Sequence, residues 1–199
     1  MQLRLTIECK HAIIIRKEVK DMAGEKSSMD ARGLAQCALF AALMCILSPI
    51  AIPVGPVPVT LGIFVVLLTA MVLPWRRAAC SVGVYLLIGA VGLPVFSGGG
   101  AGFGVFAGPT GGYLWCYLPM AVLAAAMKKW GEGIPGCLLA LLLCYFTGTW
   151  QFTALMDCSW NYALGVCVYP FLVFDIIKIL LAAILGKRVR RRLEAAELI

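Results

Sequence analysis

The chain is organised around Gly92–Gly112, with the sequence GLPVFSGGGAGFGVFAGPTGG. This stretch holds nine of the 21 glycines and no charged residue. Glycine permits positive φ and a close approach of neighbouring groups, so this density predicts irregular backbone instead of a regular helix. Irregular backbone at membrane depth must be buried in protein or line a watery cavity, because unpaired N–H and C=O groups are costly in lipid. We therefore expect a binding-site loop over a helical bundle.

The segments on both sides of this stretch are apolar enough to lie in a membrane. Of the 199 residues, 62% are hydrophobic and 14% are charged, and the mean hydropathy is +0.94. These values lie far outside the range of soluble domains. A transmembrane barrel would show strands of about ten alternating residues, and the long apolar runs indicate helices instead. The composition predicts an all-α integral membrane protein.

The 17 lysines and arginines are clustered along the chain. They comprise seven residues before position 33, the pairs Arg76-Arg77 and Lys128-Lys129, five residues from Lys187 to Arg192, and Lys178 alone. Membrane-length apolar segments separate the clusters, which fits cytoplasmic loops under the positive-inside rule better than a nucleic-acid surface. We predict six transmembrane helices in a lipid bilayer, both termini in the cytoplasm, and no nucleic-acid partner.

The six predicted spans are Gly33–Ile52, Val59–Leu73, Ala78–Val91, Tyr113–Met127, Ile134–Trp150 and Tyr162–Leu185. Three loops lack lysine and arginine and are predicted to be extracellular: residues 48–60, 92–112 and 151–161. The first loop carries four prolines and is expected to be extended. Spans two to four have only about 15 residues, roughly 22 Å of helix against a hydrocarbon core of about 30 Å. We expect the long outer loops to dip inward and enclose a cavity open to the exterior.

This topology divides the chain into three parts. Residues 1–32 form a mixed-charge cytoplasmic extension, residues 33–187 a six-helix substrate-binding domain, and residues 188–199 a basic cytoplasmic tail. The extension lacks the long apolar core and the cleavage site of a signal peptide. It is either a flexible part of the natural product or the result of a start codon chosen upstream of Met22 or Met29.

Several catalytic chemistries find no support in the sequence. The nine cysteines form no C-x-x-C pair and mostly lie in apolar segments, so we expect reduced structural residues. The single histidine, His11, lies outside the apolar region, which leaves no intramembrane zinc site or Ser-His-Asp arrangement. The glycines fit neither G-x-G-x-x-G nor G-K-[ST], so no ATP site is expected. We predict no enzyme, no metal and no cofactor.

Two charged residues lie deep in the last apolar segment. Asp175 and Lys178 are three residues apart, hence on one face of a helix and able to pair. Each such charge costs about 2.5–3.5 kcal/mol at the centre of a membrane helix, so the pair marks a functional site by default. The alternative is a buried ion pair that only fixes helix packing. A polar cavity beside the pair favours a ligand.

The first predicted span carries small residues at helical spacing. Ala31/Ala35 and Ala38/Ala42 form two small-xxx-small registers, which allow another helix to approach closely. Packing inside the bundle and docking to a separate subunit both fit this pattern. The spacing alone does not separate them.

Four motifs together resemble the BioY family: PVPVT at Pro56–Thr60, GLPVF at Gly92–Phe96, GPTGGY at Gly108–Tyr113, and PF-xxx-D-xx-K from Pro170 to Lys178. The resemblance covers about Ala35 to Gly186. BioY proteins are the substrate-specific S components of energy-coupling-factor (ECF) biotin transporters. The resemblance implies a six-helix, multi-pass protein of the plasma membrane that captures biotin from outside. It also implies that the alanine face docks on a transmembrane coupling subunit that carries two ATPase subunits.

Biotin has a neutral ureido head, an apolar ring and a carboxylate tail, and polar residues are available for both ends. Asp175 can accept the ureido N–H groups while Lys178 donates to the ureido oxygen, or Lys178 can meet the carboxylate instead. In the first arrangement the carboxylate meets water, N–H groups of the glycine loop, or hydroxyls. The predicted binding residues are Asp175, Lys178, Ser97, Tyr113, Thr110, Gly98 and Gly99. Gln151, Asp157 and Asn161 are expected to be solvated loop residues.

A second hypothesis is an autonomous secondary transporter or channel for another small solute. Proton relays usually need more acidic residues in the spans than one aspartate. The sequence therefore favours an S component over a self-sufficient pump.

Overall fold

The structure is a computed structural model that describes residues 31–53, 57–129 and 133–196. The predicted N-terminal extension, residues 1–32, lies almost entirely outside the described residues. Ala35–Ile199 form one compact unit, and the contacts that build the site lie within it.

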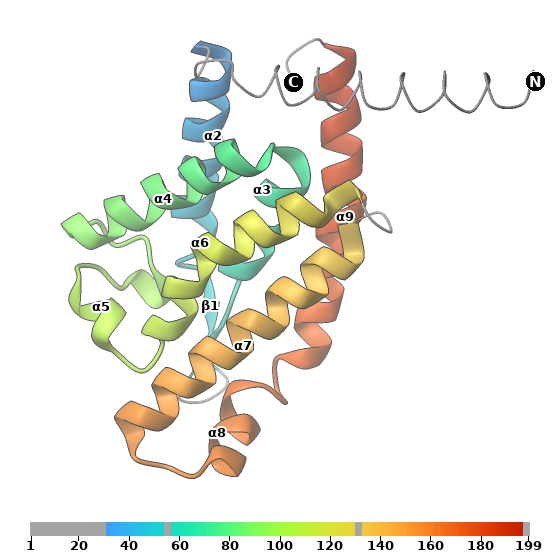
Figure 1. The fold of residues 1–199 in the computed structure, drawn as a ribbon. Helices are drawn as coiled ribbons and strands as arrows, with labels where there is room; N and C mark the ends of the chain where they lie inside the picture. The colour runs from blue at the N-terminus through green and yellow to red at the C-terminus, as the bar shows by residue number, and fades with distance from the viewer. Residues whose placement is uncertain (1–30, 54–56, 130–132, 197–199) are drawn as a thin grey trace, which may run out of the picture. The chain divides into compact units, whose positions relative to one another are not determined.

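The described chain is mainly helical, as the composition predicted (Figure 1). The longer helices are α2 (Ala31–Leu47), α3 (Gly62–Val72), α4 (Trp75–Val91), α6 (Gly111–Ala126), α7 (Ile134–Met156) and α9 (Leu172–Ala195). The short ones are η1 (Ser97–Gly99), α5 (Gly104–Ala107), η2 (Met127–Lys129) and α8 (Trp160–Cys167). Among the described residues, α7 is long and apolar enough to cross a membrane, and α8 and α9 together qualify as one bent span. The predicted count of six spans stays a prediction.

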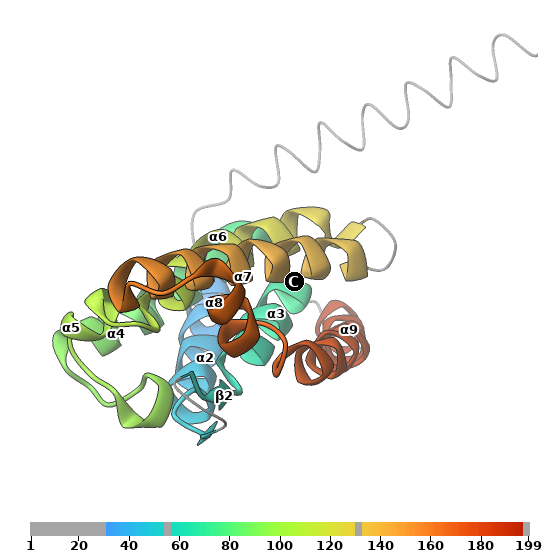
Figure 2. The same ribbon diagram turned by 90° about the horizontal axis from the view of Figure 1, so that it is seen from below.

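Helix α3 forms the centre of the packing. Nine of its 11 residues are buried, because it packs against α9, α6 and α4. Its sequence, GIFVVLLTAMV, is apolar on all sides, which is typical of an enclosed helix. Helices α6 and α7 run alongside each other on one side of this core (Figures 1 and 2). The cavity described below lies where these helices meet the outer loops.

The proline-rich first loop contains a short antiparallel hairpin. Strand β1 (Ala51–Ile52) pairs with β2 (Val59–Thr60), with Ala51 opposite Thr60 and Ile52 opposite Val59. The extended conformation predicted for this loop is thus confirmed at both strands. Helix α3 begins at Gly62, three residues after the predicted start of the second span, because Val59 and Thr60 are engaged in the hairpin.

The first predicted span was expected to reach Ile52, but α2 ends at Leu47 and Ile52 lies in β1.

Two further predicted helix boundaries are wrong. The last span was expected to be one helix over Tyr162–Leu185, but the chain breaks at residues 168–171 and α8 and α9 are bent by 48°. Pro170 explains the break, since proline lacks an N–H and its ring clashes with the preceding turn. Helix α7 continues to Met156, past the predicted end at Trp150, so the first part of the predicted 151–161 loop is helical.

Residues of the predicted cytoplasmic side tie helix ends together. The Arg77 guanidinium donates to the Gln36 side-chain oxygen at 3.0 Å, and the Lys128 ammonium donates to the Leu73 carbonyl at 2.7 Å. The Leu73 carbonyl, at the end of α3, has no partner within the helix and accepts this bond from Lys128 instead. Gly186 on α9 packs against Met71, near the same end of α3. The start of α4, the end of α6 and the carboxyl-terminal part of α9 therefore place basic residues near the end of α3.

Candidate functional site

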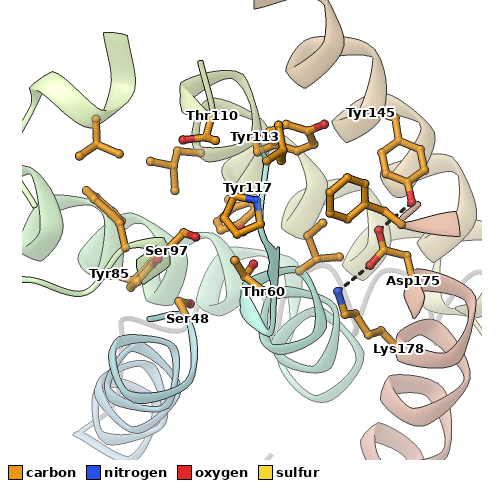
Figure 3. A pocket seen from close by; sticks show the side chains of 17 residues that line it. Ser48, Thr60, Tyr85, Ser97, Thr110, Tyr113, Tyr117, Tyr145, Asp175 and Lys178 are labelled. Atoms are coloured by element: carbon orange, nitrogen blue, oxygen red, sulfur yellow. Dashed lines mark hydrogen bonds and ion pairs between the residues drawn. The ribbon is translucent and has the colours of Figure 1, made fainter. Parts of the chain in front are cut away.

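A cavity of about 240 Å³ lies between the hairpin, the glycine-rich segment and helices α6, α7 and α9 (Figure 3). This volume is near the lower end of the range for small-molecule sites, about 300–1,000 Å³. Its polar lining residues are Ser48, Thr60, Tyr85, Ser97, Thr110, Tyr113, Tyr117, Tyr145, Asp175 and Lys178. Its apolar lining residues are Val57, Pro58, Ile63, Phe96, Val105, Leu114 and Phe171. An apolar wall with a few convergent polar groups is the usual form of a ligand pocket.

One side of the cavity, which we call the charged side, consists of Asp175, Lys178 and Tyr145. The Lys178 ammonium lies 2.7 Å from Oδ1 of Asp175, and the Tyr145 hydroxyl donates to Oδ2 at 2.7 Å. Asp175 is 1% exposed and Lys178 is 8% exposed. Both carboxylate oxygens therefore have a short hydrogen bond, as a buried charge requires.

The break before α9 places Asp175 where a helix favours a negative charge. Asp175 stands in the first turn of α9, and its backbone N–H donates to the Phe171 carbonyl at 2.8 Å. The amino-terminal end of a helix carries a partial positive charge from its N–H groups. Lys178 follows three residues later on the same face. The N–H groups at the start of α9 thus stabilise the Asp175 carboxylate from one side, and the Lys178 ammonium stabilises it from the other.

The opposite side, which we call the loop side, carries hydroxyls from segments outside the long helices. Ser48 follows α2 and Ser97 begins η1, and Figure 3 shows both beside Tyr85, across the cavity from Asp175 and Lys178. The Oγ atoms of Ser48 and Ser97 are buried. The Ser97 hydroxyl has no hydrogen-bond partner among the described residues, whereas the Ser48 hydroxyl interacts with that of Tyr85. The Tyr85 hydroxyl donates to the Val95 carbonyl at 3.2 Å.

A tight glycine turn directs Ser97 into the cavity. Gly98 and Gly99 have φ values of 63° and 79°, a left-handed conformation that side chains other than glycine rarely adopt. The Gly98 N–H donates to the Pro49 carbonyl at 3.2 Å, which ties this turn to the first loop. Both glycines are exposed and do not line the cavity. The predicted contact of Gly98 and Gly99 with a ligand therefore stays a prediction. The turn that they form leaves Ser97 at the wall of the cavity.

Gln151 holds the far end of the glycine-rich segment. Its side-chain Nε2 donates to the carbonyls of Phe106 and Gly108, at 2.7 and 2.8 Å. The expectation of a solvated loop residue is wrong here, because α7 extends far enough to carry Gln151 against the segment. A Cβ on Gly111 would overlap the Phe106 carbonyl and approach Gln151 Nε2 to 2.5 Å. Glycine is therefore required at this contact. Asp157 and Asn161 are exposed, as expected.

Five of the seven predicted binding residues line one cavity: Asp175, Lys178, Ser97, Thr110 and Tyr113. The hydroxyl of Tyr113 donates to the Cys167 carbonyl at 2.9 Å, at the break between α8 and α9. Sequence reasoning missed Tyr145 and Ser48. A tyrosine inside an apolar span needs a hydroxyl partner, which is a signal for Tyr145. Ser48 gave no such signal.

The predicted docking residues lie on an exposed face of α2. Ala31, Ala35, Ala38 and Ala42 are all exposed. Cys37, Ala41 and Met44, on the other face, are buried in the core. Ala35, Ala38 and Ala42 thus lie on the exposed face of α2.

The cysteines in the described ranges are free, and the same ranges contain no group of three or more His, Cys, Asp or Glu residues that could hold a metal ion. The residues that line the cavity offer hydroxyls, one carboxylate and one ammonium. These groups suit a small ligand with hydrogen-bond donors and acceptors at its ends.

Comparisons with known proteins agree on one family. The model of the BioY family matches residues 21–195. A biotin transporter of Lactococcus lactis, BioY2, is 39% identical over 165 residues, which cover 78% of this chain and 88% of that protein. The biotin transporter BioY of Thermotoga maritima is 34% identical, covering 80% and 96%. A crystal structure of the S-component for biotin from an ECF-type ABC transporter matches with a TM-score of 0.75 and 27% identity, covering 80% of this chain and 90% of that one.

Proposed function

The chain belongs to the BioY family, and on this premise we propose that it binds biotin in the cavity and serves as the S component of an ECF-type transporter. The observation that carries the proposal is the buried Asp175–Lys178 pair, which faces a cavity of ligand size instead of packing against apolar side chains. An ion pair that only fixed helix packing would have no such space beside it. The proposed role is transport, without a catalytic step or a cofactor.

The charged side can meet either end of biotin. Asp175 can accept ureido N–H groups and Lys178 can donate to the ureido oxygen, or Lys178 can take the carboxylate. Thr110 and Tyr113 line the wall between the charged side and the loop side. Gly98 and Gly99 support the loop side from behind Ser97.

Binding of labelled biotin to detergent-purified protein tests the site. The wild type is expected to bind with one site per chain, and Asp175→Asn and Lys178→Met are expected to lose binding while remaining folded. Arg190→Gln is the matched control, because Arg190 forms an exposed ion pair with Glu194 on the same helix. Equal binding by all four proteins would remove the site assignment.

We place the chain in the plasma membrane with six spans and both termini in the cytoplasm. Three basic clusters of the described chain gather at one end of the unit, as the contacts of Arg77, Lys128 and Gly186 indicate. The positive-inside rule would put that end in the cytoplasm. The cavity loops would then face the exterior. Labelling of single cysteines introduced at exposed positions such as Leu93 and Arg191 with an impermeant reagent would test this arrangement.

The exposed alanine face of α2 is the proposed docking surface for a transmembrane coupling subunit that carries two ATPase subunits. Small residues allow close helix approach, and Ala38→Leu with Ala42→Leu would prevent it. We expect the double variant to bind biotin but to lose the partner on co-purification. Ala154→Leu, an exposed alanine on α7, is the control for added bulk. Uptake by proteoliposomes without any partner would instead identify an autonomous transporter.

A further inference from the structure

We propose that the carboxyl-terminal part of α9 binds the headgroups of anionic phospholipids through Arg188, Arg191 and Arg192, which we call the arginine face. All three side chains are exposed. The inference rests on the proposed placement of this end of the chain at the cytoplasmic surface of the membrane. It does not depend on biotin binding.

The first argument is the direction of the arginine face. Upstream on α9, the apolar residues Ile177, Leu180 and Ile184 are 50%, 47% and 50% exposed. Their spacing of three and four positions places them on one side of the helix. Arg188 and Arg191 follow Ile184 by four and seven positions and continue that side. Lipid tails would cover the apolar residues, so the headgroups of the same lipids would lie beside the arginines.

The second argument is the depth of the arginine face. Gly186 packs against Met71 near the end of α3, and Trp75, which is 40% exposed, begins α4 four residues later. Tryptophan is enriched at the boundary between membrane and water. At about 1.5 Å per residue, Arg188 to Arg192 lie about 3–9 Å beyond Gly186. The headgroup region of one leaflet is about 5–8 Å thick, so the arginines reach the phosphates.

The third argument is the absence of an acceptor for these guanidinium groups within the described residues. Arg190, in the same part of the helix, donates to the Glu194 carboxylate at 2.7 Å. Arg188, Arg191 and Arg192 form no such ion pair within the part of the chain that the structure describes. A guanidinium group binds phosphate oxygens through two parallel hydrogen bonds. The phosphate of a lipid headgroup therefore suits the arginine face, and a net negative headgroup also matches its charge.

The test measures the affinity of the purified full chain in detergent micelles for spin-labelled phosphatidylglycerol and phosphatidylcholine, by electron paramagnetic resonance. The wild type is expected to bind phosphatidylglycerol more tightly than phosphatidylcholine. Arg188→Gln and Arg191→Gln are each expected to bind phosphatidylglycerol about fivefold more weakly, since each basic residue at an anionic surface contributes about that factor. Their affinity for phosphatidylcholine should stay within about twofold of the wild type.

Arg190→Gln is the matched control, because it removes the same charge from the same part of α9 but from a group already paired with Glu194. We expect it to leave both affinities within about twofold of the wild type. Equal weakening in all three variants would assign the effect to net charge and overturn the role of the arginine face. A wild type with no preference for phosphatidylglycerol would also overturn it.

Two further measurements on the same preparations separate the remaining outcomes. Displacement of phosphatidylglycerol by inorganic phosphate would show a site for free anions and contradict the lipid role, whereas retention of the lipid is expected. Binding of labelled biotin to the wild type reports on the proposed function by itself. Failure of the lipid preference with biotin binding intact would thus overturn this inference alone.

Discussion

The charged side and the loop side of the cavity differ in how completely their polar groups are satisfied. On the charged side, Asp175 holds Lys178 and Tyr145 at 2.7 Å each, on the long helices α7 and α9. On the loop side, Ser97 begins the short helix η1 and has no hydrogen-bond partner among the described residues, and Ser48 directly follows α2. The charged side is therefore organised before a ligand binds, whereas the described residues leave the Ser97 hydroxyl of the loop side unsatisfied.

The backbone explains this difference. A long helix satisfies its own N–H and C=O groups, so its side chains are free to form the site. The glycine-rich segment has to satisfy its backbone through separate ties, such as the Gly102 N–H to the Gly89 carbonyl at 2.8 Å and the two bonds from Gln151. Because few hydrogen bonds join this segment to other elements, its local opening costs less free energy than the unfolding of a helix. We expect ligand entry on the loop side.

The largest loss of folding stability is expected when one charge is removed from the charged side. Lys178→Met leaves the Asp175 carboxylate buried without its ion partner, which costs about 3–5 kcal/mol of folding stability. Thermal unfolding of the Lys178→Met variant in detergent would show a marked drop in Tm. Arg190→Gln removes an exposed pair and is expected to change stability by less than about 1 kcal/mol. Similar melting of both variants would show that the buried pair does not stabilise the fold.

A smaller loss is expected where the loop side meets α6. Gly111→Ala places a methyl group against the Phe106 carbonyl, so the backbone must shift, at a cost of about 1–3 kcal/mol. Gly83→Ala, in α4, meets no atom within 4 Å and is expected to stabilise the helix by about 0.5–1 kcal/mol. Thermal unfolding of the two variants should therefore shift in opposite directions, and shifts of the same sign would contradict the close contact at Gly111.

Loss of the two Gln151 hydrogen bonds is expected to change the dissociation rate of biotin more than the free energy of unfolding. Gln151→Leu removes two hydrogen bonds of about 1 kcal/mol each, so the segment opens more often and biotin dissociates about tenfold faster. Hydrogen exchange in residues 92–110 should rise, while exchange in α3 should not. Thr153→Val is the control, because its hydroxyl donates within α7 to the Thr149 carbonyl. An unchanged dissociation rate would exclude Gln151 as the tie that retains the ligand.

The smallest effect is expected from the neutral partner on the charged side. Tyr145→Phe keeps the ring and removes the bond to Asp175 Oδ2, which lowers biotin affinity about five- to tenfold through a less fixed carboxylate. Tyr162→Phe, an exposed tyrosine on α8, should have no effect in the same binding assay. Equal affinities for both variants would limit Tyr145 to a packing role.

The sequence predicted the charged side better than the loop side, for physical reasons. A charge inside an apolar span is conspicuous, so Asp175 and Lys178 stand out without any structure. Neutral hydroxyls are common in such spans and do not show which cavity they face, which is why Ser48 was missed. Tyr145 signals that its hydroxyl needs a partner, but the sequence does not identify that partner as Asp175. The role of Gln151 depends on the length of α7, and helix ends are the least certain part of a sequence-based prediction. Pro170 is a sequence signal for the break before α9, which the prediction of one helix over Tyr162–Leu185 did not use.

The most direct test of the two-sided cavity is a crystal structure of the protein with biotin bound. We expect one polar end of biotin within hydrogen-bond distance of Asp175 and Lys178, and the other end on the loop side of the cavity. Biotin in the cavity without a contact to Asp175 or Lys178 would contradict the role of the charged side. Biotin bound outside the cavity would contradict the site itself.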